Sequence, residues 1–218
     1  MKKKTSLQGA QVAQGTQRKV KLGPRFQRAF EFAADKHRTQ TRTASTIPYV
    51  AHLIGVASLV LEAGGDEELA IAALLHDVVE DCGGEKMLKE VRRRFGKRVA
   101  DIVDGCTDAY VIPKPPWRER KVSYINRLKQ ENSDTRLVSA ADKLNNVRSI
   151  LSDYRALGES VWSRFNGGRE GTLWYYRTLR DEFLRSEPNR ITLDFDLAVQ
   201  ELELLTREKE NSAPHSEV

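Results

Sequence analysis

The chain is poor in cysteine and contains no long hydrophobic run. Its 218 residues include two cysteines, Cys82 and Cys106, and their separation fits neither a zinc knuckle nor a disulfide framework. Charged residues interrupt every apolar stretch well before the ~20 residues that a membrane-spanning helix needs. The first residues, Met1 to Ser6, continue into glutamine and glycine rather than an apolar stretch, so we expect no signal peptide. These absences predict a cytoplasmic protein with reduced thiols and no membrane partner.

Acidic residues are absent from the start of the chain. Residues 1–24 combine lysine and arginine with glutamine, glycine and threonine. This composition predicts a disordered basic arm over residues 1–24. The net charge of +5 is compatible with an arm that touches nucleic acid, but a solvated tail is the favoured interpretation, and we regard nucleic acid as an unlikely partner.

Strand-period alternation and internal repeats are also missing. From Arg25 onward, apolar residues recur with helical spacing, which predicts an all-α domain over residues 25–207 and a flexible tail over 208–218. Asp66 is a predicted N-cap, and the glycine pairs at 64–65 and 83–84 are predicted helix ends. The prolines at 113, 115 and 116 predict a stiff loop. The predicted helices cover residues 26–38, 49–63, 67–82, 85–95, 97–107, 116–130, 134–157, 169–184 and 193–207.

Four chemically active residues interrupt an apolar stretch near the middle of the chain. They are His76, Asp77, Glu80 and Asp81, in the sequence Leu-Leu-His-Asp-Val-Val-Glu-Asp. In one continuous helix, Glu80 would lie one turn beyond His76, and Asp81 one turn beyond Asp77, all on one face. Burying this much charge is costly unless it is paired or binds a metal. The pattern therefore predicts a metal site.

Two further residues complete a predicted ligand set of His52, His76, Asp77 and Asp142. His52 lies in the first turn of its helix and Asp142 interrupts a buried-looking run. Each alone is typical of a core histidine or an ordinary ion pair, but their combination over three helices favours a metal. Imidazole with carboxylate suits Mn²⁺, Fe²⁺ or Zn²⁺, and the lack of thiolate argues against structural zinc. His37, between Lys36 and Arg38, is expected at the surface.

The segments around these residues resemble a known family. The order His52, His76-Asp77, Asp142 resembles the HD-domain metal-dependent phosphohydrolases. The strings Pro-Tyr-Val-Ala-His ending at His52, Ala-Ala-Leu-Leu-His-Asp-Val-Val-Glu-Asp ending at Asp81 and Ala-Asp-Lys-Leu-Asn-Asn ending at Asn146 resemble the hydrolase domain of RelA/SpoT-type alarmone enzymes. The resemblance covers residues 25–184 and implies an HD-type helical bundle with a metal site in its central cleft. We expect no synthetase domain to follow, as in stand-alone small alarmone hydrolases.

The resemblance also implies an activity and roles for individual residues. The reaction is Mn²⁺-dependent removal of the 3′-pyrophosphate from ppGpp or pppGpp, giving GDP or GTP and pyrophosphate. Glu80 and Asp81 match the catalytic acids that position and deprotonate water, with Asp81 as its more direct partner. The residues that match substrate contacts are Arg42, Lys114, Asn146, Arg169 and Thr172. Lys143 and Arg148 are further cations available to neutralise phosphates.

Departures from the family pattern leave alternatives open. Ile47, Leu53 and Cys82 stand where the family often has glycine, proline and threonine, so nucleotide preference is not fixed. The protein could hydrolyse another nucleotide, such as ppApp, NADPH or a nucleoside 5′-monophosphate. It could instead be a catalytically lapsed alarmone-binding or antitoxin-like protein, or a nucleic-acid binder acting through its basic arm. A homodimer is an open expectation.

Overall fold

Helices form nearly all of the regular structure in this computed structural model, which describes residues 19–111, 113–186 and 188–212, the last five without their side chains. Within these ranges the only β-type pairing is an isolated bridge between Thr41 and Pro48, so the predicted all-α class is confirmed. Most of the predicted arm, and residues 213–218 of the predicted tail, lie outside the described residues. The elements are α1 Pro24–Lys36, α2 Val50–Glu62, α3 Glu67–Leu75, α4 Val78–Cys82, α5 Gly84–Phe95, α6 Lys97–Cys106, α7 Trp117–Leu128, α8 Ser133–Leu157, the 3₁₀ helix η1 Gly158–Arg164, α9 Gly168–Ser186 and α10 Arg190–Ser212.

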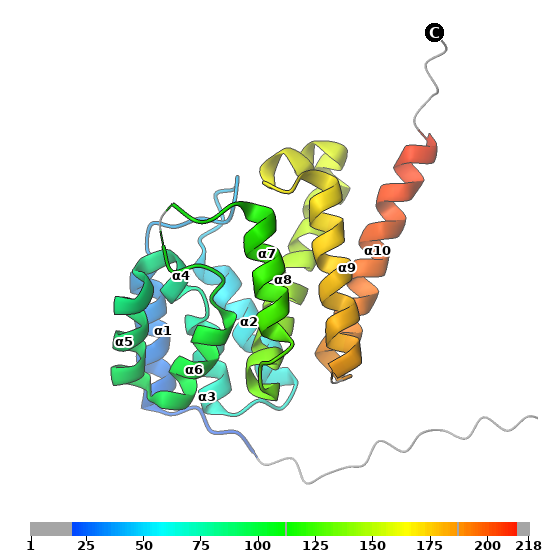
Figure 1. Ribbon diagram of the computed structural model, residues 1–218. Helices are drawn as coiled ribbons and strands as arrows, with labels where there is room; N and C mark the ends of the chain where they lie inside the picture. The colour runs from blue at the N-terminus through cyan, green and yellow to red at the C-terminus, as the bar shows by residue number, and fades with distance from the viewer. Residues whose placement is uncertain (1–18, 112, 187, 213–218) are drawn as a thin grey trace, which may run out of the picture.

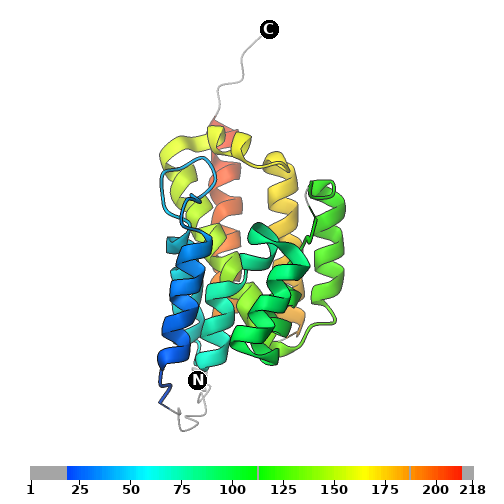
Figure 2. The same ribbon diagram turned by 90° about the vertical axis from the view of Figure 1, so that its left-hand side faces the viewer.

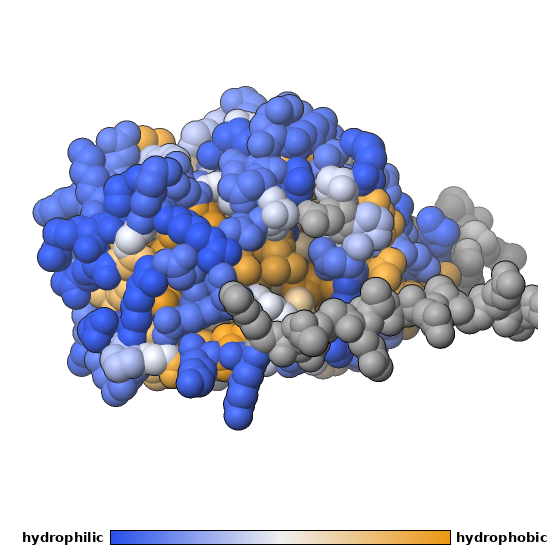
Figure 3. Space-filling view, turned by 90° about the horizontal axis from the view of Figure 1, so that it is seen from below, coloured by the Kyte–Doolittle hydropathy of each residue, from blue (hydrophilic) through white to orange (hydrophobic). Residues whose placement is uncertain are grey.

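The bundle is built around α3. Every residue of α3 from Leu69 to Leu75 is buried, because α1, α2, α6 and α8 all pack against it. The long helix α8 joins this group to α9 and α10, which lie on its other side (Figures 1 and 2). Seen from below, hydrophilic residues cover most of the surface, with hydrophobic residues between them (Figure 3). No helix in the described ranges is long and apolar enough to cross a bilayer.

Local signals account for several helix boundaries. Asp66 caps α3 as predicted, since its carboxylate accepts a hydrogen bond from the backbone N–H of Leu69 at 3.0 Å. Asn132 caps α8 in the same way, accepting from the N–H of Thr135 at 2.9 Å. Both caps satisfy backbone donors that the first helical turn leaves without partners. The helix that leads to His76 and the helix that carries Asp142 thus begin at defined positions.

The prediction of one continuous helix over residues 67–82 is wrong. The α3 helix ends at Leu75, His76 and Asp77 form a corner, and α4 begins at Val78. Asp77 has φ −97° and ψ −9° and makes no side-chain cap for α4. Its carboxylate instead accepts a hydrogen bond from the Tyr49 hydroxyl at 2.6 Å. This tertiary contact holds the Asp77 side chain at the break between α3 and α4.

Three smaller expectations also differ from the structure. His37 is buried, at 3% exposure, because the chain turns inward at the end of α1 and its ring stacks on Tyr49. The 3₁₀ helix η1, which was not predicted, begins at Gly158, whose φ of 61° ends α8. The α10 helix continues to Ser212, beyond the predicted end at residue 207, so the first residues of the predicted tail are helical.

Candidate active site

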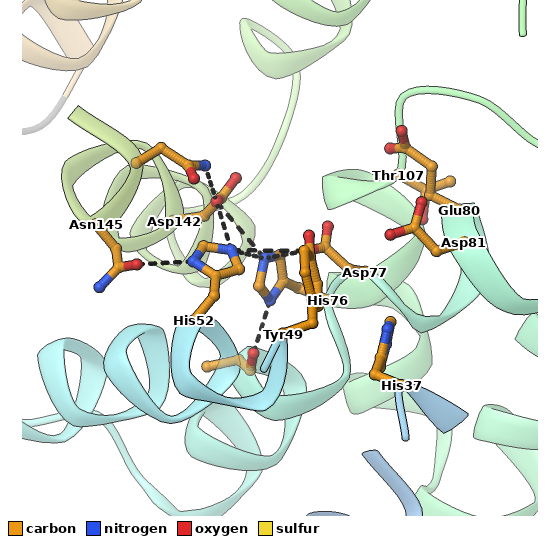
Figure 4. Close-up of polar contacts among 12 residues, drawn as sticks. His37, Tyr49, His52, His76, Asp77, Glu80, Asp81, Thr107, Asp142 and Asn145 are labelled. Carbon is orange, nitrogen blue, oxygen red and sulfur yellow. Dashed lines mark hydrogen bonds and ion pairs between the residues drawn. The ribbon is translucent and has the colours of Figure 1, made fainter. Parts of the chain in front are cut away.

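The four predicted metal ligands converge from three places in the fold (Figure 4). His52 lies in the first turn of α2, His76 and Asp77 form the corner between α3 and α4, and Asp142 lies in α8. The two Nε2 atoms are 3.2 Å apart. His52 Nε2 lies 3.2 Å from Asp142 Oδ1, and His76 Nε2 lies 3.1 Å from Asp77 Oδ2. One ligand atom each from His52, His76 and Asp142 lies within 4.8 Å of the others.

Hydrogen bonds on the far side of each imidazole fix which nitrogen faces the cluster. His52 Nδ1 lies 2.7 Å from Asn145 Oδ1, and His76 Nδ1 lies 2.8 Å from the carbonyl oxygen of Ala73. Both partners are acceptors, so each Nδ1 donates its hydrogen and each neutral ring presents an unprotonated Nε2. Two imidazole lone pairs and two carboxylate oxygens therefore face one another in a largely buried space. This donor set fits a divalent cation.

The carboxylates are held by partners outside the cluster. Tyr49 donates to Asp77 Oδ2, while Lys143 Nζ donates to Asp142 Oδ2 and Asn146 Nδ2 donates to Asp142 Oδ1, the last two at 2.6 Å each. Such contacts fix the orientation of ligand side chains. The site is therefore preorganised by two neighbours of Asp142 on α8 and by Tyr49, which directly precedes α2.

Burial and charge act against each other on these groups. Burial disfavours ionisation of Asp77, but the imidazoles of His76 and His52 hold its pKa well below the usual range. Burial likewise opposes charge on His76, yet the carboxylates of Asp77 and Asp142 raise the pKa of its imidazole well above its ordinary value. Protons and a metal cation thus compete for the same Nε2 atoms.

The predicted catalytic acids lie on α4, beside the ligand cluster. Lys114 Nζ donates to Glu80 Oε1 at 2.6 Å and to Asp81 Oδ1 at 3.2 Å. Gln40 Nε2 donates to Asp81 Oδ2 at 2.9 Å. Burial, and then the nearby charge of Asp108, raise the pKa of Glu80 to about 7. A carboxyl group with this pKa can exchange a proton at neutral pH.

Two adjoining cavities open beside the site. The first has a volume of about 440 Å³ and reaches His52 and Tyr49. The second, of about 380 Å³, is lined by the cations Arg120, Lys121 and Lys143. The lining residues that they share are Thr43, Asn146, Arg164, Phe165 and Tyr176. Both cavities therefore carry aromatic groups, and the second carries more positive charge than the first.

The structure brings most of the predicted substrate-binding residues to this region. Arg42 and Asn146 line the first cavity and are hydrogen-bonded to each other at 2.8 Å. Thr172 lines the second cavity, and Lys114 contacts the acidic pair. Arg169 instead donates to the carbonyl oxygen of Thr206 on α10 and is not among the residues lining either cavity.

Of the two further cations, Lys143 lies in this region and Arg148 lies outside it. Lys143 lines the second cavity and pairs with Asp142, whereas Arg148 is half-exposed and pairs with Asp194 on α10 at 3.2 Å. Sequence reasoning missed Arg120 and Lys121, because the run Arg-Glu-Arg-Lys at 118–121 is typical of a solvated helix face. It also missed Gln40, Tyr49 and Asn145, although Asn145 lies next to the predicted contact Asn146.

Comparisons with known proteins identify the family of the chain. The family model described as HD domain matches residues 29–173. MESH1 of Mus musculus, named a guanosine-3′,5′-bis(diphosphate) 3′-pyrophosphohydrolase, is 38% identical over 125 residues, which are 56% of this chain and 67% of the mouse protein. An Aquifex aeolicus (strain VF5) protein of the same enzyme name is 37% identical over 128 residues, 57% of this chain and 18% of that protein.

A solved structure is also similar. It belongs to a metazoan ortholog of SpoT described as hydrolysing ppGpp, and it matches with a TM-score of 0.70 at 28% identity, covering 85% of this chain and 99% of that one. The chain thus spans about two thirds of the mouse relative and less than a fifth of the Aquifex relative. On the family match and on these similarities, the chain belongs to the HD-domain family and is homologous to the MESH1 and SpoT-type 3′-pyrophosphohydrolases.

Proposed function

We propose that this protein is a Mn²⁺-dependent hydrolase that removes the 3′-pyrophosphate of ppGpp and pppGpp, releasing pyrophosphate and GDP or GTP. The observation that carries the proposal is the convergence of His52, His76, Asp77 and Asp142 beside a pair of partly buried acids. The names of the MESH1 relatives support the same reaction class. The adjoining cationic cavity suits a substrate with several phosphates.

The proposed chemistry divides between the cation and the acids. A divalent cation held by the four ligands would supply Lewis-acid polarisation of a phosphoryl oxygen. Asp81, held by Gln40 and Lys114, accepts the proton of the attacking water. Glu80 orients that water through its ionised carboxylate. A general base typically contributes about 10²–10⁴-fold to the rate.

Substrate binding in this proposal uses both cavities. The aromatic side chains of Tyr49, Phe165 and Tyr176 offer stacking surface for a nucleoside in the first cavity. Arg120, Lys121 and Lys143 in the second cavity offer charge for phosphate groups. A guanidinium group grips phosphate with two parallel hydrogen bonds, whereas lysine acts as a point charge. We keep Arg42, Lys114, Asn146, Arg169 and Thr172 as proposed substrate contacts, of which Arg169 has the least support from its position.

The test is ppGpp turnover by the purified protein after chelation and after readdition of Mn²⁺. We expect activity to disappear with chelation, to return with Mn²⁺, and to release pyrophosphate. Asp77→Asn should abolish turnover, and Asp101→Asn serves as a control because Asp101 pairs with Lys97 and Arg92 on the surface. Release of orthophosphate, or faster turnover of ppApp, NADPH or a nucleoside 5′-monophosphate, would assign another substrate. Tight ppGpp binding without turnover would indicate an alarmone-binding protein.

Location and oligomeric state are separate parts of the proposal. We propose a cytoplasmic protein, which cell fractionation tests. The homodimer stays a prediction that light scattering on the purified protein checks directly.

A further inference from the structure

Asp108 lies behind the acidic pair, in the segment between α6 and α7. Its carboxylate is only 6% exposed. Arg120 Nη1 donates to both of its oxygens, at 2.6 and 2.5 Å, and Lys121 Nζ donates to Oδ2 at 2.6 Å. A buried carboxylate with two cationic partners can be a purely structural ion pair. Two further sets of contacts connect this one to the site.

The first set joins Asp108 to Glu80. The backbone N–H of Asp108 donates to Glu80 Oε2 at 3.4 Å. Arg120 Nη1, which Asp108 holds, lies 3.7 Å from Glu80 Oε1. The guanidinium group therefore faces both carboxylates, and the position of Glu80 depends on where Asp108 holds Arg120.

The second set joins Asp108 to the cationic cavity. Arg120 and Lys121 are neighbours on α7 and both line that cavity, although their long side chains can rotate to place the charged ends elsewhere. Asp108 removes that freedom by binding both head groups. The buried Nε of Arg120 has no hydrogen-bond partner within the described part of the chain, so the guanidinium keeps donor capacity for another acceptor.

We propose that Asp108 is a positioning residue for the hydrolysis, which orients Glu80 and presents Arg120 and Lys121 to a phosphate group of the substrate. This inference rests on the proposed function. It assigns Arg120 and Lys121 to phosphate binding and Glu80 to orienting the water. The buried carboxylate of Asp108 positions all three side chains. Asp108 itself need not touch the substrate.

The charges around Glu80 give the proposal a measurable signature. Burial raises the pKa of Glu80 most, and the charge of Asp108 raises it next. Removing that charge leaves the Lys114 cation, 2.6 Å from Glu80 Oε1, so the pKa of Glu80 should fall. The charged groups that face Glu80 are Asp77 at the α3–α4 corner, Asp81 on α4, Asp108 and Lys114 in the α6–α7 segment, and Arg120 on α7.

The experiment compares Mn²⁺-loaded wild type, Asp108→Asn and Asp101→Asn in ppGpp hydrolysis across the pH range. Asn keeps the size of the side chain but removes its charge. We expect kcat of Asp108→Asn to fall about 10- to 100-fold, less than the ~10²–10⁴-fold of losing a general base. KM should rise severalfold as Arg120 and Lys121 lose their anchor, and the acidic limb of the pH profile should move to lower pH. Asp101→Asn should match wild type, and Asp108→Glu should recover part of kcat.

The alternatives give different results. Wild-type kinetics in a folded Asp108→Asn variant overturn the inference while leaving the proposed function intact. A loss of kcat with KM and the pH profile unmoved also overturns it, since a merely structural ion pair would behave in that way. An inactive wild type overturns the proposed function and this inference with it. If Asp108→Asn does not fold, Arg120→Met replaces it: loss of that cation should move the acidic limb to higher pH, and an unmoved limb refutes the inference.

Discussion

Asn145 offers a specific test of how the metal centre is preorganised. Its side-chain oxygen accepts the Nδ1 hydrogen of His52 at 2.7 Å, and its amide is packed so closely that a Cβ on Gly55 would lie 2.5 Å from Nδ2. Asn145→Ala leaves the Nδ1 donor of a histidine that is only 3% exposed without its partner. The ring then gains freedom to rotate or to change tautomer.

The expected magnitude follows from this geometry. Leaving a buried donor unsatisfied costs about 1–3 kcal/mol, and partners behind metal-binding histidines typically contribute about 10–100-fold to metal affinity or activity. These two ranges agree, because ~1.4 kcal/mol corresponds to a tenfold change in affinity. We therefore expect the Mn²⁺ dissociation constant of Asn145→Ala to rise about 10- to 100-fold.

The assay is calorimetric titration of the chelated protein with Mn²⁺, with activity followed in parallel. Ser139→Ala is a suitable control, since Ser139 is buried on the same helix, α8, and bonds to the Tyr124 hydroxyl rather than to a ligand. Saturating Mn²⁺ should restore much of the activity of Asn145→Ala. Unchanged Mn²⁺ affinity in a folded variant would refute the argument that this hydrogen bond orients His52.

Three further outcomes are expected. Mn²⁺ affinity should weaken as the pH falls from about 8 to 6, because the metal must displace protons from His52 and His76. Neighbouring carboxylates raise the pKa of both imidazoles despite their burial. A Mn²⁺ affinity that does not change with pH in calorimetric titrations would contradict this. Gly167→Ala should destabilise the fold by about 1–3 kcal/mol, since its new Cβ would lie 2.7 Å from the Trp117 ring, and an unchanged denaturant midpoint would show that the ring moves freely. Asp66→Ala should cost about 1 kcal/mol through loss of the α3 cap, and unaltered stability in urea titration would mean that the cap contributes nothing.

The proposed ligand set could be picked out from the sequence because each of its members lies in, or at the end of, a helix with strongly periodic apolar residues. The apolar residues around His52, His76 and Asp142 indicate burial, and buried imidazole with carboxylate calls for a cation. The Asp66 cap follows from a purely local preference and is confirmed by its hydrogen bond to Leu69. Helix type and approximate position were predictable for the same reason, since they depend on residues close in sequence.

Tertiary contacts decided the rest. Asp77 at the corner is hydrogen-bonded to Tyr49, which lies on another segment, and the ring of the buried His37 stacks on the same side chain. The contact of Lys114 with the acidic pair joins residues more than thirty positions apart, as the folded loop dictates. Sequence alone determined which residues are chemically able to bind a cation, because that ability belongs to each side chain. Only the fold decided which charges lie within a few ångströms of one another, because pairing between distant segments has no local signal.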